Sequence, residues 1–307
     1  MIAHHPPKAT TMNRLKMTLQ AGLAVLALVA CAKRGTEPGA TAKGTGQPKE
    51  YTLCGEVVAF SKERGTVLVK HDEIPGYMPP MTMEFTFEPA DQGKLAEGKR
   101  FRARLVDDGK GNLHFRTVEP VDEVKEQQVN AAANLLRQDT AMRGKGAYRE
   151  IGEAVPQFTL YNQEGEVVSI SRFRGRNVVL NFIYTRCPVA TMCPASTLRM
   201  TALQQAARQK GSKNLELVSI SLDPSFDTPA VLKEYARVRG IDTTNFTFLT
   251  GPESAVRDLL HQFGVIVQPG ENYLKHTLST LLINPQGLIV HRVDGTQWRP
   301  EEFLDRI

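Results

Sequence analysis

Residues 178–194 read VVLNFIYTRCPVATMCP, and this stretch decides the fold of the second half of the chain. It opens with an apolar run, Val178 to Tyr184, of the length expected for a buried strand. Cys187 and Cys193 follow, and Pro194 suits the first turn of a helix, where its missing N–H costs no hydrogen bond. This order predicts that Cys193 lies at a helix N-terminus, where the helix dipole favours the thiolate.

Strand and helix patterns alternate through the rest of residues 151–307. We expect a second buried strand over 215–222, helices over 195–210, 229–239 and 253–263, and a hairpin of strands 278–284 and 288–293. Parallel strands joined by helical crossovers and closed by an antiparallel hairpin form an α/β sandwich. The predicted class of this half is therefore α/β.

Residues 51–120 show a different pattern, with short β-rich segments separated by turn signals. The five expected strands are 55–60, 66–70, 81–87, 100–106 and 113–118. A sheet this small must close to hide its edges, so the region predicts a small all-β, OB-like barrel. Residues 121–150 place apolar side chains at helical spacing and predict a connecting helix that ends at Gly144-Lys145-Gly146.

Residues 1–30 are predicted to be a lipoprotein signal peptide. A basic segment precedes an apolar run, Met17 to Val29, that is too short to span a membrane, and Ala30-Cys31 follows in a pattern that resembles a lipobox. Cleavage there would leave Cys31 as the lipid-bearing N-terminus; the alternatives are an uncleaved anchor or an ordinary signal peptide. Residues 31–50 read as a flexible tether. We expect a lipid-anchored protein on the periplasmic face of a bacterial membrane.

The net charge of +5 does not indicate a nucleic-acid partner. Lys8, Arg14 and Lys16 lie in the predicted signal peptide, which has no acidic residue, so the mature chain carries 5 − 3 = +2. The sequence contains neither the HExxH motif of zinc proteases nor the GxSxG motif of serine hydrolases.

The remaining cysteines leave several chemistries open. In an oxidising compartment the pair Cys187 and Cys193 is a structural disulfide, a redox couple or a metal site. Cys54 stands alone and is interpreted as a small buried hydrophobe.

The second half of the chain resembles the Sco/SenC family over residues 151–307. The residues that carry the resemblance are GEAVPQF (152–158), the Cys-Pro…Cys-Pro segment, SISLDP…DTP (219–229), and His276-Thr277 ahead of LINPQG (282–287). The resemblance implies a thioredoxin-like domain that binds copper through Cys187, Cys193 and His276, as Cu(I) or as Cu(II). It also implies a role in assembling the copper site of cytochrome oxidase or in thiol redox control. The family spacing is Cys-x-x-x-Cys, whereas five residues separate the cysteines here, which leaves affinity, redox potential and partner open.

Residues 71–85 read HDEIPGYMPPMTMEF and form a second candidate metal site. Met81 and Met83 are two apart on a predicted strand, so both point to one face. Their thioethers are soft and do not titrate, so they select Cu(I) or Ag(I), and His71 would complete a three-coordinate site. The alternative is that the methionines fill a small core.

This methionine-rich segment resembles the periplasmic CusF family across residues 51–120. The resemblance implies that His71, Met81 and Met83 are copper ligands. Where the CusF site has a Trp cap, this chain has Met78, a candidate fourth ligand.

Together these patterns predict a copper chaperone. The barrel would capture Cu(I), and the thioredoxin-like domain would deliver it to a cuproprotein client such as cytochrome c oxidase. One alternative is a thiol–disulfide oxidoreductase in which Cys187 and Cys193 cycle through a disulfide. Another is a copper-resistance module that feeds an efflux component. A peroxidase is not favoured, because no Thr-x-x-Cys pattern surrounds either cysteine.

Overall fold

The computed structural model describes residues 48–61, 63–270 and 273–307. The predicted signal peptide, the predicted lipid site Cys31 and most of the predicted tether lie outside these residues. Within the described ranges, no helix has both the length and the apolar character needed to cross a membrane.

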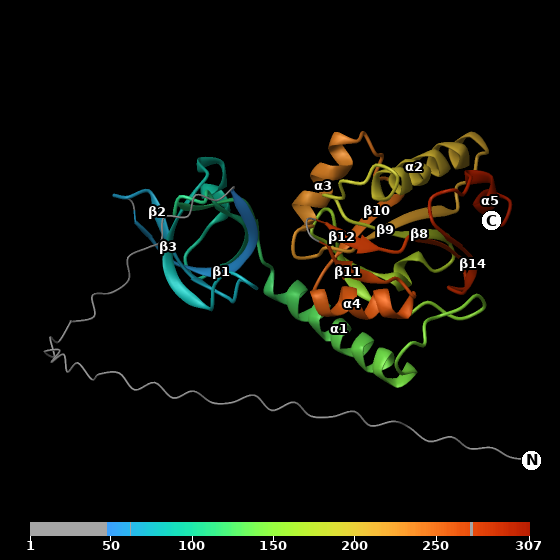
Figure 1. The fold of residues 1–307 in the computed structure, drawn as a ribbon, viewed down its shortest axis with the longest axis horizontal. Coiled ribbons are helices and arrows are strands. Elements are labelled where there is room, and N and C mark those ends of the chain that lie inside the picture. The colour runs from blue at the N-terminus through green and yellow to red at the C-terminus, as the bar shows by residue number, and fades with distance from the viewer. Residues whose placement is uncertain (1–47, 62, 271–272) are drawn as a thin grey trace, which may run out of the picture. The chain divides into compact units, whose positions relative to one another are not determined.

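The first folded region is a closed five-stranded barrel, as predicted (Figure 1). Its strands are β1 (Lys49–Ser61), β2 (Thr66–His71), β3 (Met81–Phe87), β4 (Arg100–Asp107) and β5 (Leu113–Pro120), in the order β1-β2-β3-β5-β4. A short 3-10 helix, η1 (Pro89–Lys94), follows β3. The barrel encloses its own core, which includes Phe85, Phe101 and Phe115.

Strand β1 begins well before the predicted residue 55 because it pairs with two neighbours in succession. Its first half, Lys49 to Glu56, pairs with β4, and its second half, Gly55 to Ser61, pairs with β2. The register shifts between Val57 and Ala59, and such a bulge bends a strand and increases its twist. One long bent strand therefore closes the barrel.

Helix α1 (Glu123–Arg143) follows the barrel and belongs to the core of the second region as well as connecting to it. The Asp122 side chain caps it by accepting hydrogen bonds from the N–H groups of Val124 and Lys125. Its buried side chains include Ala133 and Leu136, which join the hydrophobic core. The helix ends where predicted, at Gly144, whose φ of 86° favours glycine.

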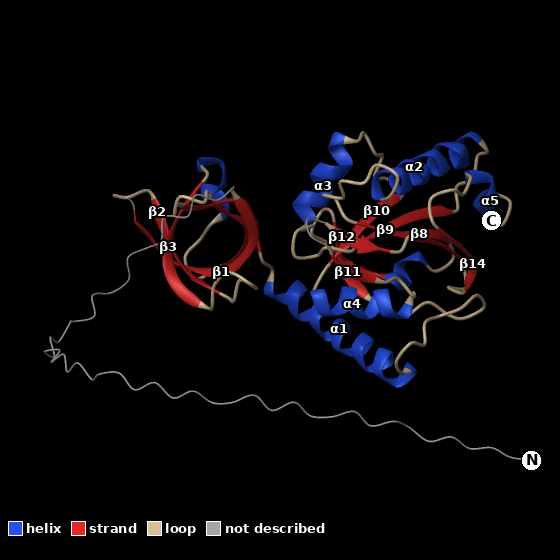
Figure 2. Ribbon diagram, viewed as in Figure 1, coloured by secondary structure: helices blue, strands red, loops and turns tan. Residues whose placement is uncertain are grey.

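The second region contains a seven-stranded mixed sheet in the order β14-β13-β8-β9-β10-β6-β7. The strands are β6 (Thr159–Asn162), β7 (Val167–Ser169), β8 (Asn177–Ile183), β9 (Leu215–Ser221), β10 (Phe246–Thr250), β13 (Ser279–Ile283) and β14 (Ile289–Asp294). The helices after η2 (Ile170–Phe173) are α2 (Cys193–Gln209), α3 (Pro229–Val238), α4 (Glu253–Gln262) and α5 (Pro300–Leu304). Helices α2 and α3 lie on one side of the sheet, and α4 with α1 lies on the other (Figure 2).

This arrangement is the predicted α/β thioredoxin-like fold. Strands β8, β9 and β10 are parallel, and β13 and β14 form the predicted antiparallel hairpin. The sequence did not predict the strands β6, β7 and β10, nor the ribbon of β11 (Val267–Pro269) and β12 (Leu274–His276). The two ribbon strands have three residues each and pair only with one another, so no periodicity can reveal them.

Candidate metal sites

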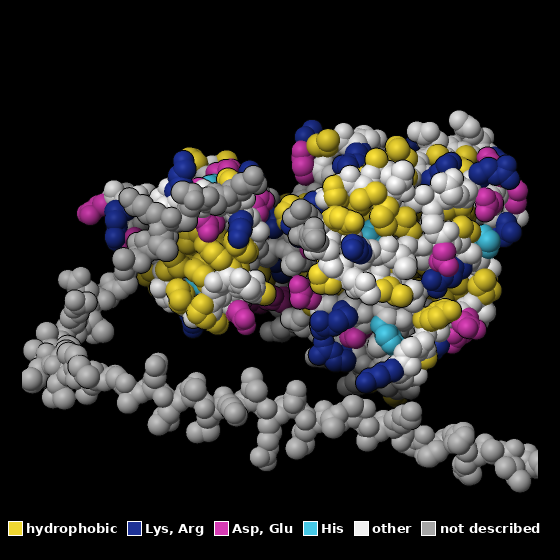
Figure 3. Space-filling model, viewed as in Figure 1, with side chains coloured by type: hydrophobic (Ala, Val, Ile, Leu, Met, Phe, Trp, Pro, Cys, Tyr) yellow, Lys and Arg dark blue, Asp and Glu magenta, His cyan; other side chains and the backbone are white. Residues whose placement is uncertain are grey.

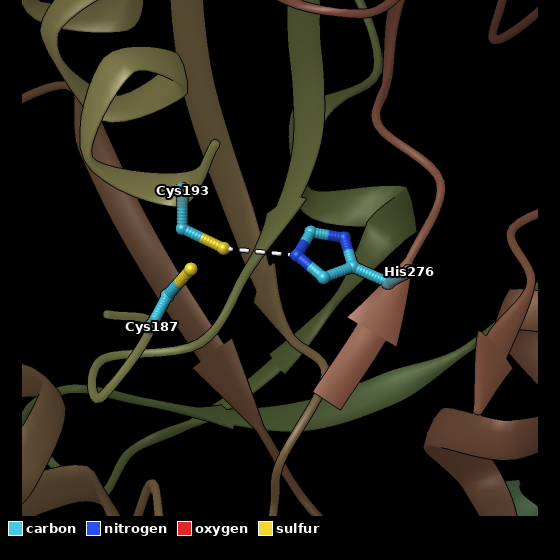
Figure 4. Close-up of side chains that lie close together, drawn as sticks. All are labelled: Cys187, Cys193 and His276. Atoms are coloured by element: carbon cyan, nitrogen blue, oxygen red, sulfur yellow. Dashed lines mark hydrogen bonds between the residues drawn. The ribbon is translucent and has the colours of Figure 1, made fainter. Parts of the chain in front are cut away.

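The fold brings Cys187, Cys193 and His276 together (Figure 4). The two sulfurs and a ring nitrogen of His276 all lie within 4.8 Å of one another. Cys187 lies in the loop after β8, Cys193 is the first residue of α2, and His276 is the last residue of β12. Cys193 Sγ and His276 Nε2 lie 3.2 Å apart. The five residues between the cysteines therefore do not keep the two sulfurs apart.

Local hydrogen bonds shape the cysteine loop. The Cys187 N–H donates to the Tyr184 carbonyl at 3.4 Å, and the Met192 N–H donates to the Val189 carbonyl at 3.0 Å. The Ser196 N–H donates to the Met192 carbonyl at 2.8 Å and so joins the loop to the first turn of α2. Pro194 lies in that first turn, as predicted.

The start of the loop is held by Asp227, which the sequence analysis quoted as part of the DTP motif without giving it a role. Its carboxylate accepts hydrogen bonds from the Thr185 N–H, at 3.1 Å, and from the Ser221 hydroxyl, at 2.6 Å. Asp227 is completely buried, at 0% exposure. Because Thr185 precedes Cys187 by two residues, this carboxylate fixes where the cysteine loop leaves the sheet.

The buried Asp227 carboxyl leads to a prediction about pH. Burial raises its pKa from 3.8 to about 6, and the hydrogen bonds from Ser221 and Thr185 offset only part of this rise. The folded state then binds the proton more tightly than the unfolded state, so stability is lost as the pH rises from about 4 through about 6. We expect Asp227→Asn to remove a pH dependence of about 2 kcal/mol in the free energy of unfolding over this window. Denaturant unfolding of both proteins at about pH 4, 5 and 6.5 measures it, and two parallel stability curves would contradict it.

The His276 ring is oriented by its own backbone neighbour. Its Nδ1 lies 3.0 Å from the Thr277 carbonyl oxygen, so this nitrogen carries the proton and leaves the Nε2 lone pair facing the Cys193 sulfur. Burial lowers the pKa of His276, and the hydrogen bond to Thr277 opposes this only in part. The imidazole is therefore held neutral, which is the form that binds metal ions.

The predicted thiolate at Cys193 is wrong for the metal-free protein. Cys193 is buried at 0% exposure, and burial raises the pKa of its thiol, with the neighbouring Cys187 adding to the effect. Desolvation disfavours the charged sulfur and is the largest cause of this rise. A metal ion that binds here must therefore displace a proton.

The donor set at this site fits copper. Two sulfurs and one imidazole nitrogen are soft and borderline ligands, which suit copper or zinc and do not suit magnesium or calcium. As whole residues, Cys187 and His276 are half-buried and Cys193 is buried. Ile266 and Tyr273, next to the β11–β12 ribbon in the chain, are exposed at 58% and 38%. Hydrophobic side chains gather on the face of the second region that Figure 3 shows.

The second candidate site lies in the barrel. His71 ends β2, Met81 begins β3, and the two are directly paired across the strands, while Met83 is paired with Val69. Because pairing partners and residues two apart share a face, the three side chains lie on one face of the sheet. His71 is 2% exposed, whereas Met81 is 42% exposed and Met83 packs against the barrel core.

The His71 ring shows an unpaired nitrogen. Its Nδ1 lies 2.7 Å from the Asp72 carbonyl oxygen and therefore carries the proton. Its Nε2 is buried and has no hydrogen-bond partner among the described residues. A buried polar atom without a partner costs free energy, and a bound metal ion would remove this cost.

Backbone hydrogen bonds and side-chain contacts hold the loop between β2 and β3. Ile74 and Met78 exchange backbone hydrogen bonds of 2.9 and 3.0 Å, and Met78 packs against the barrel core. Tyr77 stacks on Tyr51 with ring centroids 4.1 Å apart and donates a 2.8 Å hydrogen bond to Asp107. These contacts fix Met78 in an ordered loop, and its role as a ligand stays a prediction.

The interpretation of Cys54 as a small buried hydrophobe is only partly confirmed. Cys54 is half-buried on β1, with Arg102 of β4 as its pairing partner, while Leu53 and Gly55 on either side of it are buried. Alternation along the strand turns Cys54 away from the core that its neighbours face.

Comparison with known proteins shows where the second region belongs. The family model described as SCO1/SenC matches residues 147–307, more than half of the chain. The chain belongs to the SCO1/SenC family. The family model described as copper binding periplasmic protein CusF matches residues 50–120. Both resemblances stated from the sequence are thereby confirmed, and we refer to residues 147–307 as the SCO1/SenC domain.

Individual relatives and solved structures match about half of this chain. A SCO1 protein homolog of Bacillus subtilis is 33% identical over 154 residues, which are 49% of this chain and 78% of that protein. A crystal structure of a SCO1/SenC family lipoprotein from Bacillus anthracis is 28% identical, with a TM-score of 0.47 and coverage of 52% of this chain and 96% of that chain. A structure of BsSco, described as a member of the Sco family of cytochrome c oxidase assembly proteins, is 29% identical, with a TM-score of 0.45 and coverage of 51% and 92%.

Proposed function

We propose that this protein is a copper chaperone with two copper-binding modules. The barrel captures Cu(I) through His71, Met81 and Met83. The SCO1/SenC domain accepts the ion on Cys187, Cys193 and His276 and passes it to a cuproprotein client such as cytochrome c oxidase. The observation that carries this proposal is the meeting of two sulfurs and one imidazole nitrogen within 4.8 Å of one another, from segments as far apart in the chain as Cys187 and His276.

The chemistry of the two ligand sets supports a direction of transfer. Neutral thioethers bind Cu(I) without losing a proton, whereas thiolates add negative charge and bind it more tightly. Copper therefore moves from the barrel to the SCO1/SenC domain. The unpaired nitrogen of His71 and the partly exposed Met81 suit a site that exchanges its ion readily.

Two observations support a proposed location for the chaperone. The lipobox-like Ala30-Cys31 supports a lipid anchor, and the tether over residues 31–50 would hold the folded regions off the membrane. The matching barrel family is described as periplasmic. We therefore place the protein on the periplasmic face of a bacterial membrane. The exposed Ile266 and Tyr273 beside the copper site give a client protein an apolar surface to contact.

An anaerobic Cu(I) titration of the full chain tests the proposal. With the cysteines reduced, we expect two tightly bound equivalents in competition with a Cu(I) chelator. A single equivalent that disappears when the barrel methionines are replaced would contradict copper binding by the SCO1/SenC domain. No bound copper at all would contradict the whole proposal.

A thiol–disulfide oxidoreductase is the second candidate, and the cysteine geometry favours it specifically. Cys187 is half-buried and Cys193 is buried, an arrangement in which the more accessible sulfur attacks a client disulfide and the inner sulfur resolves the mixed disulfide. Reduction of insulin by dithiothreitol, accelerated by the wild type and not by Cys187→Ser, would support this activity. Oxidase or efflux genes next to the gene would separate delivery to an oxidase from a copper-resistance role.

A further inference from the structure

Helix α1 carries apolar side chains on two opposite faces. One face is buried against the core of the second region, and the helix packs on α4. A helix with one buried face normally turns polar side chains toward the solvent. On the other side of α1, however, Val124, Leu135 and Met142 are exposed at 74%, 67% and 81%. This second apolar face is a candidate surface for a partner.

The three exposed side chains belong to one continuous stripe along the helix. Steps of eleven and seven residues are close to whole turns of an α-helix, so the three lie within about 20° of one line. With the exposed residues between them they form the outer stripe: Val124, Gln128, Ala131, Leu135, Gln138 and Met142. Its members are alternately four and three residues apart, which is the spacing of the contact positions of a coiled coil.

The outer stripe is complementary to itself when two copies of α1 run antiparallel. The facing pairs are then Val124 with Met142, Gln128 with Gln138, and Ala131 with Leu135. Apolar side chains meet apolar ones, and the small alanine meets the larger leucine, so the layers can interdigitate. Each glutamine amide meets another amide, which both donates and accepts hydrogen bonds. Every pair occurs twice, as the two-fold symmetry of a dimer requires.

The ends of α1 favour the same direction. The first turn is acidic, with Glu123 and Glu126, and the last turn carries Arg143. Antiparallel pairing places the acidic end of one helix beside the basic end of the other and opposes the two helix dipoles. Parallel pairing would bring like ends together and set Ala131 against Ala131. Arg143 also bonds Glu153 of its own chain, so the charge effect adds to the packing argument and does not replace it.

We propose that α1 is a dimerisation element, and that two copies of this chain pair antiparallel through their outer stripes. The two family models match residues 50–120 and 147–307, so α1 belongs to neither match. The helix has 21 residues and is about 30 Å long, and two such helices form a small interface. We therefore expect a reversible dimer whose population rises with protein concentration. The inference goes beyond the proposed function and does not depend on copper.

Sedimentation velocity of the full chain over a wide range of protein concentration tests the inference. We expect Leu135→Glu to weaken the dimer by more than about a hundredfold, because two-fold symmetry places two unpaired carboxylates in each interface. Leu198→Glu is the matched control, because Leu198 is exposed at 70% on α2 and lies outside the outer stripe. It should dimerise as the wild type does. Both positions are exposed, so the melting temperatures of the two monomeric variants should be similar.

A pair of charge substitutions tests the antiparallel direction. Gln128→Lys alone introduces an unpaired cation into two layers of the dimer and should weaken it. Gln128→Lys combined with Gln138→Glu should restore it, because antiparallel pairing sets the introduced charges of opposite sign against each other in both layers. In a parallel pair, the same double variant would set like charges against each other and abolish the dimer.

Each outcome decides the inference. A wild type that stays monomeric at every concentration would overturn it and leave the outer stripe to a partner of another kind. Self-association that Leu135→Glu and Leu198→Glu weaken equally, or that neither weakens, would assign the contact to another surface and overturn it as well. A dimer that the double variant does not restore would contradict the antiparallel pairing. None of these results bears on copper binding, which the Cu(I) titration tests separately.

Discussion

Cys193→Ser is expected to lose the copper equivalent of the SCO1/SenC domain, with an affinity decrease of more than about a hundredfold. A hydroxyl is a poor ligand for a soft ion, and even residues outside the ligand set change metal affinity by about 10–100-fold. The Cys193 sulfur also lies 3.2 Å from His276 Nε2, so the substitution removes a ligand atom that is in direct contact with the imidazole. The barrel equivalent should remain, and anaerobic Cu(I) competition on the full chain measures both.

The chain offers a matched control for this variant. Cys54 is a free, half-buried cysteine on β1, outside the SCO1/SenC domain. Cys54→Ser should bind copper as the wild type does. If Cys193→Ser and Cys54→Ser lose the same amount of copper, the loss reflects general thiol binding, and the three-ligand site is refuted.

Met81→Leu and Met83→Leu are each expected to lose the barrel equivalent while the protein stays folded. Leucine has nearly the volume of methionine, and such exchanges cost less than about 1.5 kcal/mol, so packing is preserved while the thioether is removed. Met81 is 42% exposed and should tolerate the change with almost no loss of stability, whereas Met83 packs against the core and should lose slightly more. We expect Cu(I) affinity at the barrel to fall by more than about a hundredfold in either variant.

This pair of variants also decides between copper binding and core filling. Methionines that only fill space would be replaced by leucine without any effect on copper. Met142→Leu, on the exposed face of α1 at 81% exposure, is the control for losing any surface thioether. Barrel copper affinity that is unchanged in both Met81→Leu and Met83→Leu would show that the resemblance of this region to CusF does not extend to its metal site.

Local sequence determined most of the regular structure. The apolar run before Cys187 forms β8, Pro194 lies in the first turn of α2, and Gly144 ends α1. The alternating segments of residues 51–120 form the closed barrel. These features depend on side-chain periodicity and on the conformational limits of proline and glycine, which act over a few neighbouring residues.

What only the tertiary structure decided is the environment of each site residue. The sequence assigned ligand roles to Cys187, Cys193 and His276 by resemblance. The fold showed that the two sulfurs come together despite the five-residue spacing. His276 reaches them from a ribbon whose two strands pair only with one another. The protonation of Cys193 was mispredicted because a helix N-terminus can be read from local sequence and burial cannot. Asp227 entered the sequence analysis only as part of a motif, and its role was missed for the same reason. Its contacts join segments that meet only in the folded chain, and no local pattern records the desolvation there.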